Sequence, residues 1–133
     1  MSLCAYAATH EGSLQHRWLA RDLARVDRRT TPWLIVQTHV PFYNSNSGHW
    51  REAERMRAEL EPLLYSYGVD LLLAGHVHSY ERTHAVYDGA LNPCGTIHLV
   101  LGDGGNREGA YAAPARTSNP PALACDLHHR VSP

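Results

Sequence analysis

The sequence has little net charge and no long apolar run, and both absences restrict its class. Its formal net charge is -1 at pH 7, which gives no electrostatic reason to expect nucleic acid or an anionic membrane as a partner. No run of apolar residues approaches membrane-spanning length, and the start of the chain lacks the basic and apolar pattern of a signal peptide. We therefore predict a soluble globular protein whose partners must be inferred from a site.

Cysteine is also scarce and widely spaced. The chain has Cys4, Cys94 and Cys125, and no two of them form a Cys-x-x-Cys pair. This spacing excludes a zinc knuckle and a thioredoxin-type motif. One disulfide with a free thiol and three reduced thiols both stay open, so the sequence does not fix the redox compartment.

Histidine, by contrast, is abundant, with 10 residues in a chain of 133. His39 follows the apolar run 33–36, and His76 and His78 follow the apolar run 69–74. Continuous apolar runs are typical of strands buried on both faces of a sheet, and in open α/β sheets ligands bind beyond the carboxyl ends of the strands. Because imidazole is the commonest metal ligand among side chains, we predict a metal site at this edge.

The apolar pattern predicts an α/β fold. Helical spacing predicts one helix over residues 13–26 with Ser13 as its N-cap, and another helical pattern covers residues 50–67. Pro62 lies inside the second pattern and predicts a break into two short helices. Strands are predicted at 33–37, 69–74 and 96–101. A helical connection between the first two strands predicts that they run parallel.

Three further features are interpreted as structural. The charged residues 51–57 are typical of a solvated helix face. Asp70 is expected to cap an element or form an ion pair, and His98, inside a strand, is expected to be a hydrogen-bonded structural residue.

Together, several of these segments resemble the purple acid phosphatases, within the calcineurin-like metallophosphoesterase superfamily. The Gly-His-x-His element at 75–78 is similar to that of the whole superfamily. The segment 31–45 is also part of the resemblance, and the Tyr-Glu-Arg continuation at 80–82 and the glycine-rich turn 102–106 narrow it to the family. The resemblance covers about residues 13–109.

The resemblance implies a partial metallophosphoesterase β-sandwich with flanking helices, about half of a catalytic domain. On this basis residues 1–12 are expected to form an irregular segment and residues 13–112 the partial domain. Residues 113–133 are rich in Ala, Pro and Ser, and we expect a disordered tail there.

The resemblance also implies a chemistry, which is hydrolysis of phosphate monoesters at a centre of Fe(III) and a divalent metal, Zn, Mn or Fe. By motif position, His39 and His76 resemble ligands of the divalent ion, and His78 resembles a ligand of the ferric ion. His49 resembles the family's loop histidine, which contacts phosphate and can protonate the leaving group. A secreted or vacuolar/lysosomal location is suggested by the resemblance alone.

The family carries three more ligand motifs upstream, and none of them occurs in residues 1–32. These are Asp-x-Gly, Gly-Asp-x-x-Tyr and Gly-Asn-His. A ferric ion held by one imidazole lacks the anionic oxygen ligands that hard cations prefer. We therefore expect an interior fragment or a truncated gene model, without turnover and with at most one weakly bound divalent ion.

Two alternatives stay open. In the first alternative to the phosphatase, the chain is a non-catalytic remnant that has a weak single-metal site or an interaction role. In the second, it is part of a calcineurin-like phosphodiesterase. A phosphodiesterase predicts a preference for diesters, and the Tyr-Glu-Arg segment argues against it.

Overall fold

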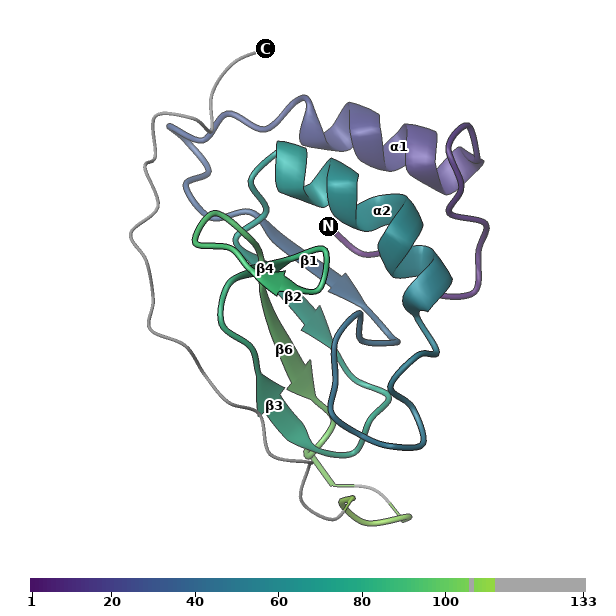
Figure 1. Cartoon of the computed structure of the whole chain (residues 1–133). Helices are drawn as coiled ribbons and strands as arrows, with labels where there is room; N and C mark the ends of the chain where they lie inside the picture. The colour runs from purple at the N-terminus through teal and green to yellow at the C-terminus, as the bar shows by residue number, and fades with distance from the viewer. Residues whose placement is uncertain (106, 112–133) are drawn as a thin grey trace.

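The structure is a computed structural model that describes residues 1–105 and 107–111. A mixed four-stranded sheet carries two helices on one side, and a short two-stranded hairpin packs beside it (Figure 1). The α/β fold class is confirmed. The predicted tail at 113–133 lies outside the described residues.

The first helix, α1, spans Leu14–Leu23 and begins where the sequence predicts. Ser13 is its N-cap, because the Ser13 side-chain oxygen accepts a hydrogen bond of 3.2 Å from the backbone N–H of His16. Among the described residues, neither this helix nor the next is long and apolar enough to cross a membrane.

The second helix, α2, spans Glu54–Ser66 with Pro62 inside it. The prediction of two short helices is therefore wrong. Proline removes one backbone hydrogen bond, but Leu60 and Leu64 are 0% and 1% exposed on either side of it. Burial of both turns against the core holds the helix together through Pro62.

The sheet has the strand order β1-β2-β6-β3, in which β1 pairs parallel with β2 and β2 pairs parallel with β6. The predicted parallel pairing of the first two strands is confirmed. β3 pairs antiparallel with β6, and β4 and β5 form the hairpin. The bounds are Ile35–Thr38 (β1), Leu71–Ala74 (β2), Tyr80–Arg82 (β3), Val86–Tyr87 (β4), Ala90–Leu91 (β5) and Ile97–Leu101 (β6).

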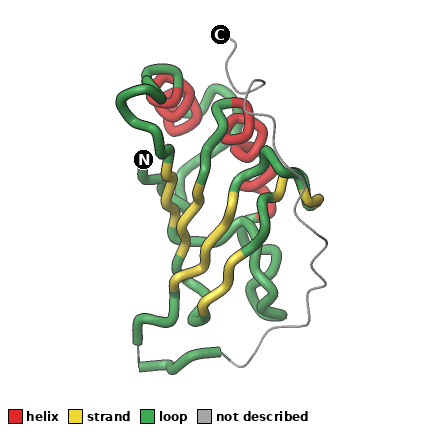
Figure 2. Tube along the Cα trace, turned by 90° about the vertical axis from the view of Figure 1, so that its left-hand side faces the viewer, coloured by secondary structure: helices red, strands yellow, loops and turns green. Residues whose placement is uncertain are grey.

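Only one face of the sheet is well buried, so the prediction of strands buried on both faces is wrong for this chain. Val36 and Leu72 are 0% exposed beneath the helices, whereas Ile35 and Leu101 on the other face are 39% and 46% exposed. Within the described residues no helix covers that second face (Figure 2). The apolar runs are real, but only every second side chain enters the core.

The first residues of the chain extend the sheet beyond β1. The backbone N–H of Leu3 donates to the carbonyl of Gln37 at 2.8 Å, and the N–H of Gln37 donates to the carbonyl of Met1 at 2.9 Å. The outer edge of β1 is therefore paired rather than open.

Asp70 pairs as predicted, at the start of β2. Its Oδ2 accepts a hydrogen bond of 2.8 Å from the backbone N–H of Leu34 and lies 2.7 Å from Nη2 of Arg28. The carboxylate thereby ties the entry of β1 to the segment that follows α1.

A buried polar cluster joins α2 to the loop after β1. Arg57 Nη1 donates to Glu61 Oε2 at 2.7 Å, and Tyr43 Oη donates to Glu61 Oε1 at 2.6 Å. The Arg57 and Glu61 side chains are only 13% and 7% exposed. Burial, with a further contribution from the Glu61 carboxylate, raises the pKa of Tyr43 to about 12.

His98 lies on the buried face of β6, in contact with aromatic rings. Its ring centroid is 4.8 Å from that of Tyr43 and 6.0 Å from that of Phe42. Neither ring nitrogen has a hydrogen-bond partner among the described residues, so the prediction of a hydrogen-bonded histidine is wrong. Burial, reinforced by the positive charge of Arg57, lowers the pKa of His98 to about 3. The imidazole is therefore neutral and acts as an apolar core residue.

Candidate metal centre

The histidines singled out from the sequence lie at the carboxyl edge of the parallel strands. His39 follows β1, and His76 and His78 follow β2, the strand beside it. Thr38 and Ala74 are register partners at the strand ends, so the two exits leave the sheet side by side. His49 lies in the loop between β1 and α2.

His39 and His76 come into direct contact. His39 Nε2 lies 3.1 Å from His76 Nδ1, and the rings meet edge to face with centroids 4.9 Å apart. Two nitrogens bound tetrahedrally to one zinc ion at 2.0–2.1 Å are separated by about 3.4 Å. This pair therefore fits a single divalent cation with little rearrangement.

The backbone after β2 sets the directions of His76 and His78. The N–H of Val77 donates to the carbonyl of Gly75 at 2.7 Å, and the N–H of Ser79 donates to the carbonyl of Val77 at 2.8 Å. Each histidine is thus the central residue of a three-residue turn. His76 has φ of +61°, a region that a side-chain-bearing residue rarely adopts. Strain of this kind is typical of functional sites.

Gly102, just after β6, lets the chain pass close to these turns. A Cβ atom added at Gly102 would lie 1.9 Å from the carbonyl oxygen of Val77. The Gly102 N–H donates to the carbonyl of Ser79 at 3.1 Å. Only glycine fits at this position, because any side chain would displace the turns that carry the histidines.

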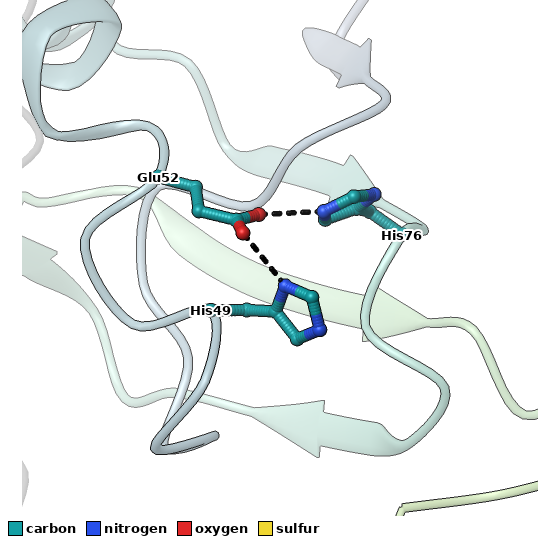
Figure 3. Close-up of side chains that lie close together, drawn as sticks. All are labelled: His49, Glu52 and His76. Atoms are coloured by element: carbon teal, nitrogen blue, oxygen red, sulfur yellow. Dashed lines mark hydrogen bonds and ion pairs between the residues drawn. The ribbon is translucent and has the colours of Figure 1, made fainter.

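Glu52 is a member of the site that the sequence analysis missed. Figure 3 shows its carboxylate between two imidazoles, with Oε2 2.6 Å from His76 Nε2 and Oε1 2.8 Å from His49 Nδ1. The hydrogen bond from His49, with a smaller contribution from His76, lowers the pKa of the Glu52 carboxyl. The interpretation of 51–57 as a solvated helix face is wrong for Glu52, because α2 begins only at Glu54 and Glu52 lies in the preceding turn.

His78 lies apart from this group. Its Nδ1 is 3.5 Å from Glu108 Oε2, an ion-pair distance at which no hydrogen bond forms, and its ring stacks on Tyr111 with centroids 5.2 Å apart. Within residues 1–105 and 107–111, His78 makes no hydrogen bond or ring contact with His39, His49 or His76.

Tyr111 links the two parts of the site. Its backbone N–H donates to the carbonyl of His78 at 2.9 Å, and its Oη lies 3.1 Å from His49 Nε2. The sequence offered no signal for Tyr111, because it lies beyond the glycine-rich turn, where the periodic pattern ends.

Comparisons with known proteins show which family the chain belongs to. The sequence profile of the family described as Calcineurin-like phosphoesterase matches residues 3–80. Purple acid phosphatase 18 of Arabidopsis thaliana is 55% identical over 107 residues, which are 80% of this chain and 24% of that protein. Purple acid phosphatase 15 of the same plant is 53% identical over 80% of this chain and 20% of its own length.

A solved structure shows the same likeness in three dimensions. The purple acid phosphatase isolated from yellow lupin (Lupinus luteus) seeds superposes with a TM-score of 0.77 at 33% sequence identity, over 88% of this chain and 23% of that one. The chain thus spans about a quarter of the length of the relatives it matches. It belongs to the calcineurin-like phosphoesterase family, and within that family it resembles the purple acid phosphatases.

Proposed function

We propose that this chain forms part of the catalytic domain of a phosphatase that hydrolyses phosphate monoesters at a centre of two metal ions. The observation that carries the proposal is the 3.1 Å approach of His39 Nε2 to His76 Nδ1 at the ends of adjacent parallel strands. The likeness to purple acid phosphatases supports it.

In this proposal His39 and His76 bind the divalent ion, which is Zn, Mn or Fe. His78, from the second three-residue turn, binds Fe(III). When bound, two such ions supply Lewis-acid stabilisation of the charge on the phosphoryl group. The two nitrogens that face each other, His39 Nε2 and His76 Nδ1, already have a fixed orientation. The strand ends and the strained turn at His76 hold the backbones of both histidines in place.

His78 alone is a poor ligand set for a ferric ion. Among the described residues the one carboxylate paired with it is Glu108, with a side chain that is 76% exposed. Ferric iron is a hard cation that prefers anionic oxygen donors. We therefore propose that further ligands come from additional polypeptide and that this chain has no turnover on its own.

His49 is proposed to contact the phosphate and to protonate the leaving group. Glu52 accepts a hydrogen bond from one edge of its ring, and Tyr111 Oη contacts the other edge. A ring held at both edges keeps one orientation, which general acid catalysis requires. Gly48 stands where the family often has a second histidine, so His49 carries this role without that neighbour.

The half-covered sheet supports the proposal of a larger domain. Ile35, Trp33 and Leu101 expose 39%, 67% and 46% of their surface on or beside the face without helices. A second sheet packed on this face would complete the sandwich that the family resemblance implies. A secreted or vacuolar location belongs to the same proposal and rests on the relatives alone.

A chimera tests the function. Residues 1–111 of this chain replace the matching segment of purple acid phosphatase 18 of Arabidopsis thaliana. The purified product is assayed with an aryl phosphate monoester at pH 5 to 6. We expect hydrolysis that falls at least about a hundredfold in His39→Ala, His76→Ala and His78→Ala. His84→Ala is the matched control, since His84 is exposed and outside the site.

Two results would contradict the proposal. One is a folded, metal-loaded chimera that does not hydrolyse monoesters, which would favour the non-catalytic remnant. The other is a preference for diesters over monoesters, which would favour a phosphodiesterase. The isolated chain, assayed in parallel, is expected to show no hydrolysis above the chelator control.

A further inference from the structure

The outward side of α1 carries a stripe of exposed side chains. Successive helical residues are about 100° apart around the axis, so four residues of α1 fall within an arc of about 100°. They are Leu14, Arg17, Trp18 and Arg21, called here the α1 stripe, and all four are exposed. Figure 1 shows α1 at the top of the molecule, whereas the carboxyl ends of β1 and β2 point downward. The stripe is therefore separate from the candidate metal centre.

The positive charge on this side of the molecule is unpaired. Arg17 and Arg21 lie one helical turn apart, and Arg25 follows four residues later, just past the end of the helix. Within residues 1–105 and 107–111, no ion pair joins any of the three to a carboxylate. Three successive unpaired guanidinium groups make a local cationic surface on a chain with a net charge of only -1. Such a surface attracts an acidic partner.

The helix macrodipole explains only part of this pattern. Positive charge is stabilising near the C-terminus of a helix, which accounts for Arg21 and Arg25. It does not account for Leu14 and Trp18, which are 80% and 37% exposed on the same stripe. Arginine and tryptophan are enriched among the residues that dominate the binding energy of protein–protein interfaces. The combination is therefore typical of a surface that binds another protein.

A membrane and a nucleic acid both fit the stripe poorly. An amphipathic helix binds a membrane by burying a continuous apolar face in the lipid. The apolar face of α1 is already packed in the core, where Leu19 and Leu23 are 0% and 2% exposed. Only Leu14 and Trp18 remain to insert. A nucleic acid requires a broader basic surface than three side chains on a chain of this net charge.

We propose that the α1 stripe, together with Arg25, binds an acidic helical segment of another protein. The step from Arg17 to Arg21 is four residues, or about 6 Å along the helix axis. Carboxylates four residues apart on a second helix have the same spacing, so each can pair with one guanidinium. An apolar residue beside them packs on Trp18. The inference does not rest on the proposed phosphatase function.

Fluorescence anisotropy with the full chain tests the inference. The probe is a labelled peptide of about 20 residues built from repeated Glu-Leu-Ala-Ala units, which is long enough to form a helix. The control peptide has glutamine in place of every glutamate. Because the surface is small, we expect a dissociation constant between about 1 µM and about 1 mM for the acidic peptide at low salt. The glutamine peptide should bind at least about tenfold more weakly.

Charge reversal locates the binding surface. Arg17→Glu combined with Arg21→Glu should weaken binding of the acidic peptide by at least about tenfold, because carboxylates then face carboxylates. The matched control is Arg82→Glu combined with Arg107→Glu, which makes the same change in net charge at exposed positions outside α1. At about 0.1 M salt, where the Debye length is about 10 Å, the control pair should leave the affinity within about threefold.

Truncation of tryptophan tests the apolar contact. Trp18→Ala should weaken binding by about tenfold. Trp33→Ala removes a tryptophan that is 67% exposed and lies outside α1, and it should leave the affinity unchanged. In NMR spectra of the wild-type chain, the indole N–H of Trp18 should shift on addition of the acidic peptide, and that of Trp33 should not. Circular dichroism checks that each variant is folded.

Three outcomes overturn the inference. The first is a folded chain that does not bind the acidic peptide at low salt. The second is equal weakening by the two charge-reversal pairs, which would show a non-specific effect of net charge. The third is binding of vesicles of equal parts phosphatidylcholine and phosphatidylserine in place of the peptide, which would make the stripe a membrane-contact surface. None of these results affects the monoester activity of the chimera.

Discussion

Replacement of His98 by leucine should make the stability of this protein less sensitive to acid. The His98 imidazole is buried and its nitrogens lack partners among the described residues, so the folded state resists protonation. Its pKa falls from the ordinary value of 6.5 to about 3. The unfolded chain therefore binds a proton on His98 before the folded chain does, and stability falls as the pH drops from about 6.5 toward 3.

The size of the effect follows from linkage. With pKa values of 6.5 unfolded and about 3 folded, the wild-type chain loses about 2 kcal/mol of unfolding free energy between pH 8 and pH 5 through this one group. His98→Leu removes that loss. It should also stabilise the chain at neutral pH, since buried polar atoms without partners cost about 1–3 kcal/mol.

The pH dependence of the unfolding free energy is measured by urea denaturation at several pH values between 8 and 5, with circular dichroism as the signal. The informative quantity is the difference in unfolding free energy between the variant and the wild type, because the other nine histidines cancel in it. That difference should grow by about 2 kcal/mol toward pH 5. Replacement of the exposed His84 by leucine is the control and should give a flat difference. Parallel pH profiles for wild type and His98→Leu would refute the reasoning.

Three further predictions concern stability, each measured by urea denaturation. Gly102→Ala should lower the unfolding free energy by about 2–3 kcal/mol through overpacking. Gly104→Ala should be nearly neutral, because an added Cβ there meets nothing within 4 Å. Equal effects of the two substitutions would contradict the close approach of Gly102 to the carbonyl of Val77. Arg57→Met should cost about 3 kcal/mol because it strands a buried carboxylate, while Arg55→Met, with a side chain that is 79% exposed, should cost below about 0.5 kcal/mol. Ser13→Ala should cost about 1 kcal/mol through loss of the helix cap, and an unchanged midpoint would show that the cap contributes nothing.

The sequence was sufficient for the features that local patterns control. The cap at Ser13, the parallel strands and the convergence of His39 and His76 all follow from spacing and from the rule that parallel strands present their carboxyl ends at one edge. The helix through Pro62 could not be predicted in this way. At Pro62, burial of the helical turns on both sides outweighs the tendency of proline to break a helix.

The rest of the site depends on contacts between distant segments. In the sequence, Glu52 is one charged residue among several. Its side chain points toward His76 because Glu52 lies in the turn before α2, which begins only at Glu54. Tyr111 reaches the site through a segment without any periodic pattern. His98 looks like an ordinary strand histidine until its neighbours are known to be the rings of Phe42 and Tyr43, with which its nitrogens form no hydrogen bond.

Each of the two turns at 75–79 spans only three residues. A residue in these turns can therefore be substituted, but an added residue would break the turn. An added residue would swing the following imidazole to another side, whereas a substitution keeps the direction and changes only the donor atom. Asn and Asp tolerate the left-handed backbone that His76 adopts and offer oxygen in place of nitrogen. His76→Asp is therefore the simplest way to redirect this edge from borderline metals toward harder ones such as manganese.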